Sequence, residues 1–371
     1  MVFGQQKYDA LTPLSRCTWW NAYYQTGFTK NEKHNNDEVL EDFKFHNVSG
    51  ELKSEKIEDV LIQELRLAAL LHDVGHGPLA HKFDDFTLSK HELFKIINGD
   101  NDLKQFNDFF KELLEPIKDN GRIDHEVISC VFIIKIIGSL KSALKEKRFS
   151  EKPSKLIPQI DVKRILKMIE PKPDSLPPIK INKIDYTPFF SSIISSFPLD
   201  ADRMDYLYRD SYFSGVNYGY YDISRLLMSF IPINSNNSIY LSIKESGIDA
   251  VIRFIQSRTH LFNQVYSHKT NRAANCMLDY ACRKIKPPII KVKNFKQLQD
   301  FYWENSDEHF LWNTLKDKIT EDKKGTKSLD DLLERKLWKR VYEKKIVITK
   351  SITSKDKGVI KKAEEIFKKL S

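Results

Sequence analysis

Apolar residues recur at helical spacing along most of the chain. In residues 57–74, IEDVLIQELRLAALLHDV, they follow one face that broadens toward the end of the segment, which predicts an amphipathic helix with a buried end. Residues 125–140, HEVISCVFIIKIIGSL, are apolar almost all round and predict a central helix. Residues 247–285 predict two long helices or one kinked helix. The pattern therefore favours a mainly α-helical protein.

Strand signals are short and few. Residues 238–243, SIYLSI, follow the turn-forming NSNN, and residues 345–352, KIVITKSI, form a second β-branched run. Such runs are typical of a small attached sheet. Two proline-rich stretches predict loops between residues 150 and 182. We therefore expect a mainly α fold with a small β appendage and a mixed C-terminal lobe.

The same signals suggest three parts. Residues 1–50 form a divergent N-terminal segment, residues 51–285 the helical core, and residues 286–371 a lysine-rich C-terminal lobe. No internal repeat is visible in the sequence.

Composition and charge indicate which class of partner the protein could bind. The 371 residues are 41% hydrophobic and 30% charged, as in an ordinary globular protein. The net charge of +9 is compatible with an anionic ligand or nucleic acid, and equally with a solvated basic surface. The four cysteines form no CxxC pair, which indicates reduced thiols in a cytoplasmic protein. The apolar run VISCVFII stops at Lys135, too short to span a bilayer, so we expect no membrane association.

The stretch LLHDVGHGPLAH concentrates ionisable groups behind the first predicted helix. Its two glycines and its proline end that helix, so that the first two polar residues lie on its last turns and the others just beyond. Imidazole and carboxylate are ligands for a divalent transition metal, and a cation makes a buried carboxylate tolerable. A single His-Asp pair is more often only hydrogen-bonded, but the dense cluster favours a metal site. Its ionisable residues are His72, Asp73, His76 and His81.

A second polar stretch is residues 199–222, LDADRMDYLYRDSYFSGVNYGYYD. On a helix, Asp202, Tyr206 and Asp210 share one face. Arg203 and Arg209 flank this face. Carboxylates, a phenol and guanidinium groups can ligate a metal and bind phosphate, although simple salt bridges along the helix would also explain the spacing.

Together these two stretches resemble the HD-domain phosphohydrolases. The resemblance is to the branch of deoxynucleoside triphosphate triphosphohydrolases that includes the SAM-and-HD-domain enzyme and its bacterial relatives. A third stretch, RFIQSRTHLFNQVYSHKTNRAANCMLDYA, residues 253–281, is similar to a helical segment of that family. The similarity covers roughly residues 60–285, which makes residues 51–285 the expected HD phosphohydrolase core.

The resemblance implies a role for each matching residue. A divalent ion, which could be Mg, Mn, Fe or Zn, would be held by His72, Asp73 and Asp202. The catalytic residues would be His76, His81 and His125, with His81 protonating the leaving 5′ oxygen. The substrate would be bound by Arg203, Tyr206, Asp210, Arg258 and Tyr266.

Two positions depart from the family pattern. The family's first metal ligand is a histidine in a stretch resembling RFEHS, and this chain offers His34 or His46 in different surroundings. Spacing favours His34, but the ligand could also be absent. A further family histidine is matched by His91 or His125, and we prefer His125 because it opens an apolar helix.

The resemblance implies hydrolysis of a dNTP to deoxynucleoside and triphosphate by a metal-dependent enzyme that forms homo-oligomers. The alternative is a catalytically degenerate HD-fold protein that binds nucleotide or nucleic acid as a sensor or regulator. A third possibility is an enzyme that acts on nucleic-acid ends or on cyclic nucleotides. The intact pair of His72 and Asp73 favours the first function, and the altered RFEHS-like stretch favours the second.

Overall fold

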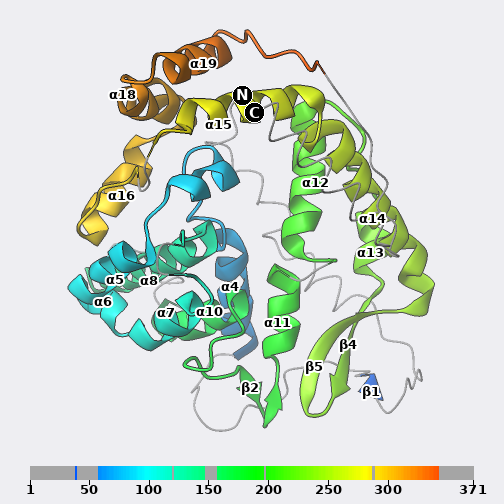
Figure 1. Cartoon of the computed structure of the whole chain (residues 1–371). Coiled ribbons are helices and arrows are strands. Elements are labelled where there is room, and N and C mark those ends of the chain that lie inside the picture. Colours follow the sequence, from blue (N-terminus) through cyan, green and yellow to red (C-terminus); the bar gives the residue numbers. More distant parts are fainter. Residues whose placement is uncertain are drawn as a thin grey trace, which may run out of the picture.

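The computed structural model describes residues 38–39, 57–118, 121–146, 157–195, 198–285 and 289–341. Helices dominate these residues and a small sheet lies at one end (Figure 1), so the predicted mainly α fold with a β appendage is confirmed. The helices that build and flank the core are α4 (Ile57–Leu71), α5 (Lys90–Gly99), α6 (Asn101–Lys104), α7 (Asn107–Leu114), α8 (His125–Lys145), α10 (Val162–Ile169) and α11 (Thr187–Ile194). The later helices are α12 (Ala201–Ser214), α13 (Ile223–Leu227), α14 (Ile248–Leu261), α15 (Lys269–Cys282), α16 (Phe295–Glu304), α17 (Asp307–His309), α18 (Lys316–Ile319) and α19 (Lys323–Leu333).

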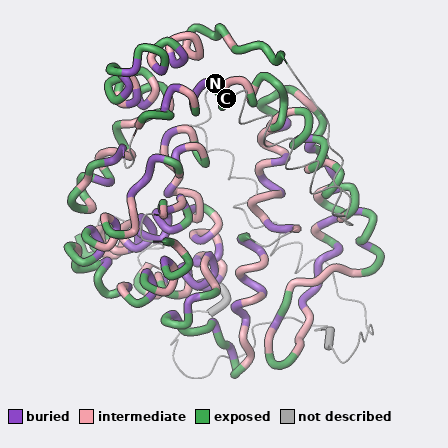
Figure 2. Tube along the Cα trace, viewed as in Figure 1, coloured by how far each residue is buried: buried purple, intermediate pink, exposed green. Residues whose placement is uncertain are grey.

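The main core forms where α4, α8 and α10 meet (Figure 2). Helix α4 buries its predicted apolar face, including Leu61, Leu65 and Ala68. Helix α8 spans 21 residues and is apolar and long enough to cross a membrane by composition alone. Its residues from Val127 to Ile134 are buried in the core, which accounts for its apolar character.

Helix α10 corrects one expectation. It lies within residues 150–182, which the prolines predict to be loops, and its N-cap Asp161 accepts a hydrogen bond from the backbone N–H of Lys163. Its apolar residues Ile165, Leu166 and Ile169 pack into the main core. Burial of this face therefore stabilises a short helix between two proline-rich segments.

The sheet has the strand order β1-β4-β5-β3-β2. Strands β4 (Phe230–Ser235) and β5 (Ser238–Ile243) form an antiparallel hairpin, and β5 has the predicted bounds. The connecting Asn236 and Asn237 both have positive φ, which suits a tight hairpin turn. The other strands are the short β1 (Glu38–Val39), β2 (Lys180–Ile181) and β3 (Ile184–Asp185).

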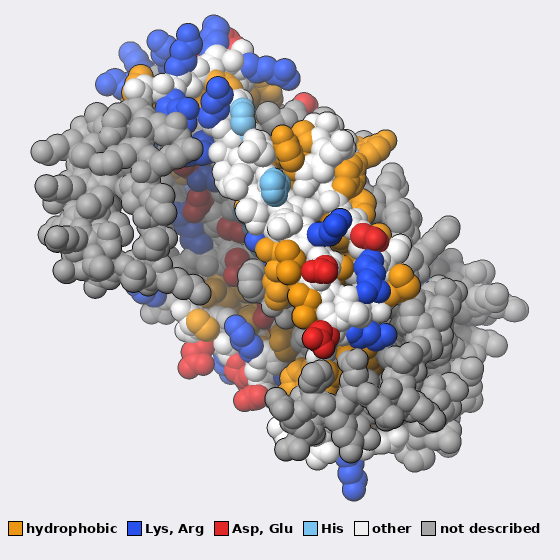
Figure 3. Space-filling model, turned by 90° about the vertical axis from the view of Figure 1, so that its right-hand side faces the viewer, with side chains coloured by type: hydrophobic (Ala, Val, Ile, Leu, Met, Phe, Trp, Pro, Cys, Tyr) orange, Lys and Arg blue, Asp and Glu red, His pale blue; other side chains and the backbone are white. Residues whose placement is uncertain are grey.

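A second hydrophobic cluster joins α12 to α14. Met204 and Leu207 of α12 are fully buried there, with Phe254 and Leu261 of α14. Residues 247–285 form two helices, α14 and α15, separated by a π-helical turn, η4 (Phe262–Tyr266). The outer side of this region carries hydrophobic side chains among charged ones (Figure 3).

The described part of the C-terminal lobe, residues 289–341, contains helices α16 to α19 and a second π-helical turn, η5 (Phe310–Leu315), and no strand. The predicted strand at 345–352 lies outside the described residues, so the mixed character of this lobe stays a prediction. The proposed boundaries at residues 50 and 285 also stay predictions.

Candidate metal and phosphate site

The turn after α4 presents the first ligands. The helix ends at Leu71, so His72 follows it directly, although its backbone N–H still donates to the carbonyl of Ala68 at 2.9 Å. Nδ1 of His72 lies 2.9 Å from the carbonyl oxygen of Ala69. With Nδ1–H donating to this carbonyl, Nε2 points away from the helix with its lone pair available, the arrangement common in metal-bound histidines.

Gly75 brings this turn against α8. Its N–H donates to Oγ of Ser129 at 2.8 Å. A Cβ at this position would overlap the backbone of His125 and Ser129. Any larger residue would therefore push the end of α4 away from α8, which explains the glycine.

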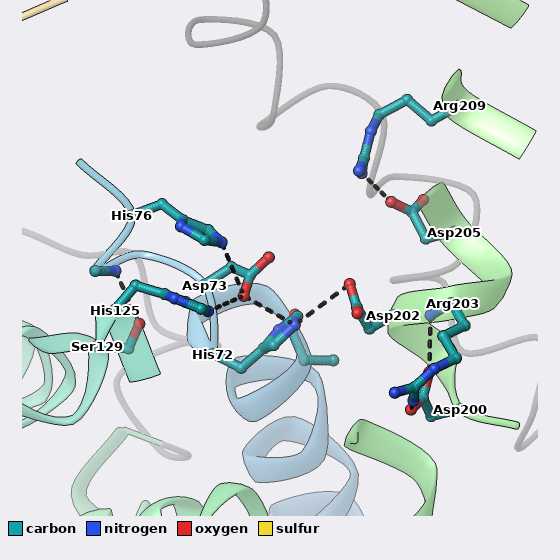
Figure 4. Close-up of polar contacts among 12 residues, drawn as sticks. His72, Asp73, His76, His125, Ser129, Asp200, Asp202, Arg203, Asp205 and Arg209 are labelled. Carbon is teal, nitrogen blue, oxygen red and sulfur yellow. Dashed lines mark hydrogen bonds and ion pairs between the residues drawn. The ribbon is translucent and has the colours of Figure 1, made fainter. Parts of the chain in front are cut away.

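His72, Asp73 and Asp202 come together (Figure 4). They are the three described metal ligands that the resemblance implies. Nε2 of His72 lies 3.4 Å from Oδ1 of Asp73 and 3.6 Å from Oδ1 of Asp202. One ligand atom from each of the three residues lies within 4.8 Å of the others. Asp202 reaches this position from the first turn of α12.

The chemistry of this set fits a divalent cation. Nε2 of His72 is buried and makes no well-formed hydrogen bond within the described part of the chain. Burial favours the neutral imidazole, but the contact with Asp202 and the charge of Asp73 outweigh it and raise the pKa of His72 to about 9. Two carboxylates thus attract positive charge to this point, where one imidazole and two carboxylates could hold a metal ion.

A second cluster contains His76, His81 and His125. The rings of His76 and His125 are stacked with centroids 3.7 Å apart. The ring of His81 lies edge-on to both, at 4.7 and 4.8 Å. Oδ1 of Asp73 is 3.8 Å from Nε2 of His76 and 3.9 Å from Nε2 of His125, so Asp73 borders both clusters (Figure 4).

Asp84 contacts this histidine cluster, and the sequence did not predict it as a site residue. Its Oδ2 lies 3.1 Å from Nδ1 of His125 and 3.8 Å from Nδ1 of His81. Burial would raise the pKa of Asp84, but the hydrogen bonds to His125 and His81 lower it to about 2. The spacing of three residues from His81 was the available signal. The side chain of His81 is 78% exposed, whereas those of His76 and His125 are only 9% and 10% exposed.

Four of the predicted substrate residues form one group beside α12. Nε–H of Arg258 donates to Oη of Tyr206 at 3.3 Å, and the hydroxyl of Tyr266 donates to the carboxylate of Asp210. The guanidinium of Arg258 also lies 4.5 Å from the centre of the Phe262 ring. The π-helical turn η4 contributes Tyr266 and Phe262. Tyr206 and Asp210 follow Asp202 along the same helix, so the group extends from the metal ligands along α12.

Arg203 differs from this group because it forms an ion pair with Asp200. Asp200 is fully buried and also caps α12 by accepting from the backbone N–H of Arg203. Burial and the nearby charge of Arg258 lower the pKa of Arg203. One buried carboxylate therefore holds the predicted phosphate-binding arginine close to Arg258.

Asp205 is a further residue that sequence reasoning missed. It lies one turn after Asp202, is buried, and pairs with Arg209. Burial raises its pKa to about 6 although the charge of Arg209 opposes the shift. No sequence pattern indicated that Asp205, and not Asp210, would be the buried acid within α12.

The remaining candidate histidines separate clearly. His125 lies in the histidine cluster, whereas His91 is exposed near the start of α5. His34 and His46 lie outside the described residues, so the identity of the first ligand stays a prediction.

Comparison with known proteins agrees with this geometry. Residues 221–369 match the family described as the HD associated region. The HD domain-containing protein L394 of Acanthamoeba polyphaga mimivirus is 26% identical over 304 residues, which cover 78% of this chain and 54% of L394. The chain is thus similar to an HD-domain protein, and its C-terminal part matches a region associated with that domain.

Other relatives match smaller parts of this chain. The protein YwfO of Bacillus subtilis (strain 168) is 31% identical over 222 residues, 59% of this chain and 36% of YwfO. Human deoxynucleoside triphosphate triphosphohydrolase SAMHD1 is 22% identical over 225 residues, 59% of this chain and 31% of the enzyme. The chain thus spans 31% to 54% of the length of these relatives. A crystal structure of a phosphohydrolase from Bacteroides thetaiotaomicron VPI-5482 aligns with a TM-score of 0.43 and 21% identity, over 77% of this chain and 60% of that one.

Proposed function

We propose that this protein is a metal-dependent HD-domain phosphohydrolase that converts a dNTP to deoxynucleoside and triphosphate. The observation that carries the proposal is the placement of His72, Asp73 and Asp202 within 4.8 Å of one another, with the histidine cluster on the other side of Asp73. A divalent ion bound by these three residues would lower the pKa of a bound water and neutralise charge on the phosphate.

The chain's own residues would bind the phosphates and handle the proton. His76 and His125 lie beside Asp73, where their N–H groups can donate to phosphate oxygens. His81 is more exposed, and its Nδ1 lies 3.8 Å from Oδ2 of Asp84. In our proposal His81 donates a proton to the 5′ oxygen when the bond between that oxygen and the α-phosphorus breaks.

The group along α12 would bind the rest of the nucleotide. Arg258 offers donors to a triphosphate, and its hydrogen bond to Tyr206 orients the guanidinium. The pair of Tyr266 and Asp210 supplies polar atoms suited to a sugar. The choice of a dNTP is further supported by the similarity to human deoxynucleoside triphosphate triphosphohydrolase SAMHD1.

Isotope-labelled water tests both the reaction and the bond that breaks. Hydrolysis of each dNTP in H₂¹⁸O should release deoxynucleoside without label and triphosphate with one ¹⁸O, because water attacks the α-phosphorus. Labelled monophosphate with pyrophosphate, or label in the 5′ hydroxyl, would contradict the proposed cleavage. Nucleotide binding without any product would favour the degenerate sensor or regulator.

A further inference from the structure

The segment that carries His81 has an unusual backbone. Leu79 has φ 67° and ψ 14°, and Ala80 has φ 50°. Both residues therefore lie in the left-handed region, which non-glycine residues rarely adopt because Cβ approaches the backbone. Two such residues in succession persist only where the surrounding structure holds them. Leu79 and Ala80 directly precede His81, so their backbone conformation determines the position of the His81 side chain.

The C-terminal lobe provides the contact that holds this backbone. The N–H of Leu79 donates to Oδ1 of Asp307 at 2.8 Å. Asp307 is the first residue of α17, which is capped by Oγ of Ser306 accepting from the N–H of His309. The carboxylate is half-buried and lies on a capped helix, so it offers Leu79 a fixed acceptor.

The same lobe also fixes the segment after His81. Phe83 is fully buried. Its ring packs edge-on against Phe310, with 5.3 Å between centroids, and stacks on Phe301, with 5.9 Å between centroids. The carbonyl of Phe86 accepts a hydrogen bond from the N–H of Ile289 at 3.2 Å. The lobe therefore anchors the segment on both sides of the histidine.

We propose that Asp307 is a positioning residue for His81. Its carboxylate keeps Leu79 and Ala80 in the left-handed conformation and thereby places the imidazole of His81 beside His76 and His125. The inference rests on the proposed function, because it gives His81 a part in turnover. The hydrogen bond between Leu79 and Asp307 also connects the HD associated region, residues 221–369, with the segment that carries His81.

Turnover by three single variants tests the proposal. Asp307→Ala removes the acceptor and should lower kcat for dNTP hydrolysis about 10- to 100-fold, since a displaced catalytic group has an effect of this size. KM and bound metal should change little, because Arg258 and His72 are untouched. Asp307→Asn keeps an acceptor oxygen and should stay within about threefold of the wild type. The control Glu308→Gln changes the exposed neighbour and should have no effect.

A rescue variant separates positioning from general destabilisation. Leu79→Gly added to Asp307→Ala should restore much of kcat, because glycine adopts the left-handed conformation without the Cβ clash. Wild-type kcat in Asp307→Ala, or a loss accompanied by loss of metal, would overturn the proposal.

Amide hydrogen exchange tests the inference without relying on turnover. In Asp307→Ala the amides of residues 79–86 should exchange at least about tenfold faster, while those of α8 remain protected. Unchanged exchange at Leu79 would overturn the inference. Absence of dNTP hydrolysis by the wild type would instead contradict the proposed function, so the two failures are distinguishable.

Discussion

Nε2 of His72 lies 3.6 Å from Oδ1 of Asp202, and this contact joins the end of α4 to the start of α12. His72 directly follows α4, and Asp202 lies in the first turn of α12; each of these helices has a buried apolar face. The two hydrophobic clusters of the protein therefore determine the distance between the two ligands. Asp73 completes the set from the position next to His72.

Asp73→Asn should remove bound metal and hydrolysis together. The amide is a poorer ligand than the carboxylate. Loss of a residue that only hydrogen-bonds to a metal ligand lowers metal affinity roughly 10- to 100-fold, so loss of a direct ligand should lower it at least as much. Metal analysis by mass spectrometry and circular dichroism would show metal loss with an intact helical signal. Asp108→Asn, at an exposed position of α7, is the control. Stoichiometric metal in Asp73→Asn would mean that the ligand assignment is wrong.

Gly75→Ala should destabilise the protein because the added methyl group would overlap the backbone of α8. We expect a loss of about 1–3 kcal/mol in the free energy of unfolding, measured by urea denaturation, together with weaker metal binding. Gly138→Ala is the matched control on α8, where an added Cβ meets no atom within 4 Å. That change should stabilise the helix by about 0.5–1 kcal/mol. Equal effects of the two substitutions would contradict the packing described for Gly75.

Much of the helical fold could be predicted from periodicity. The buried faces of α4 and α8 and the bounds of β5 follow directly from the apolar pattern. Helix α10 could not, because its eight residues lie between proline-rich segments and its stability comes from contacts with α4, α8 and α11. Local pattern is weakest where long-range packing decides the structure.

The candidate site shows the same division. The resemblance to the HD-domain phosphohydrolases implied that His72, Asp73 and Asp202 share one metal ion, and the structure places one ligand atom of each within 4.8 Å of the others. The contact of Asp84 with His125 depends on how the segment after α4 packs on α8, which no local pattern specifies. The left-handed Leu79 had no sequence signal at all, because such positions are usually recognised by glycine or asparagine.

Arg258→Ala should strongly reduce turnover. Loss of a buried, charge-assisted contact to a phosphate typically costs about 2–5 kcal/mol, so kcat/KM for a dNTP should fall correspondingly. Arg253→Ala removes an exposed arginine from the same helix and is the control. Each variant loses one positive charge, so a difference between the two separates a specific contact from general electrostatic attraction.

The lysine-rich C-terminal end provides the complementary test. Neutralising several lysines between Lys344 and Lys369 should mainly weaken salt-sensitive binding to polyanions. Filter binding with single-stranded nucleic acid at several salt concentrations would measure this. If these lysine changes abolish nucleotide binding while neither the wild type nor Arg258→Ala hydrolyses any dNTP, the sensor or regulator function is correct instead.

Glu170→Gln should make stability less dependent on pH. Burial, with the charges of Glu126 and Asp124, raises the pKa of Glu170 to about 7 although Lys172 opposes the shift. A raised carboxyl pKa means that the folded state holds the proton more tightly than the unfolded state. Stability therefore falls as the pH rises from about 4.5 to 7, and the cost is complete above that range.

The substitution mimics the protonated form, so its benefit should appear at pH 8 and vanish near pH 4. At one pKa unit per 1.36 kcal/mol, the gain at pH 8 is at most about 3 kcal/mol. Thermal unfolding at both pH values measures it, with the exposed Glu115→Gln as control. A variant less stable than the wild type at pH 8 would show that the ionised Glu170 is stabilised in the fold.

Metal content and triphosphate release, measured on the same purified protein, test the central claim most directly. The protein is stripped with a chelator, each divalent ion is added back in steps, and release of triphosphate from each dNTP is followed at every step. We predict that release rises in proportion to bound metal, reaches its maximum at stoichiometric loading, and is absent from Asp202→Asn at the same added concentration. Triphosphate release by the stripped protein, or stoichiometric loading of the wild type without release from any dNTP, would contradict the account.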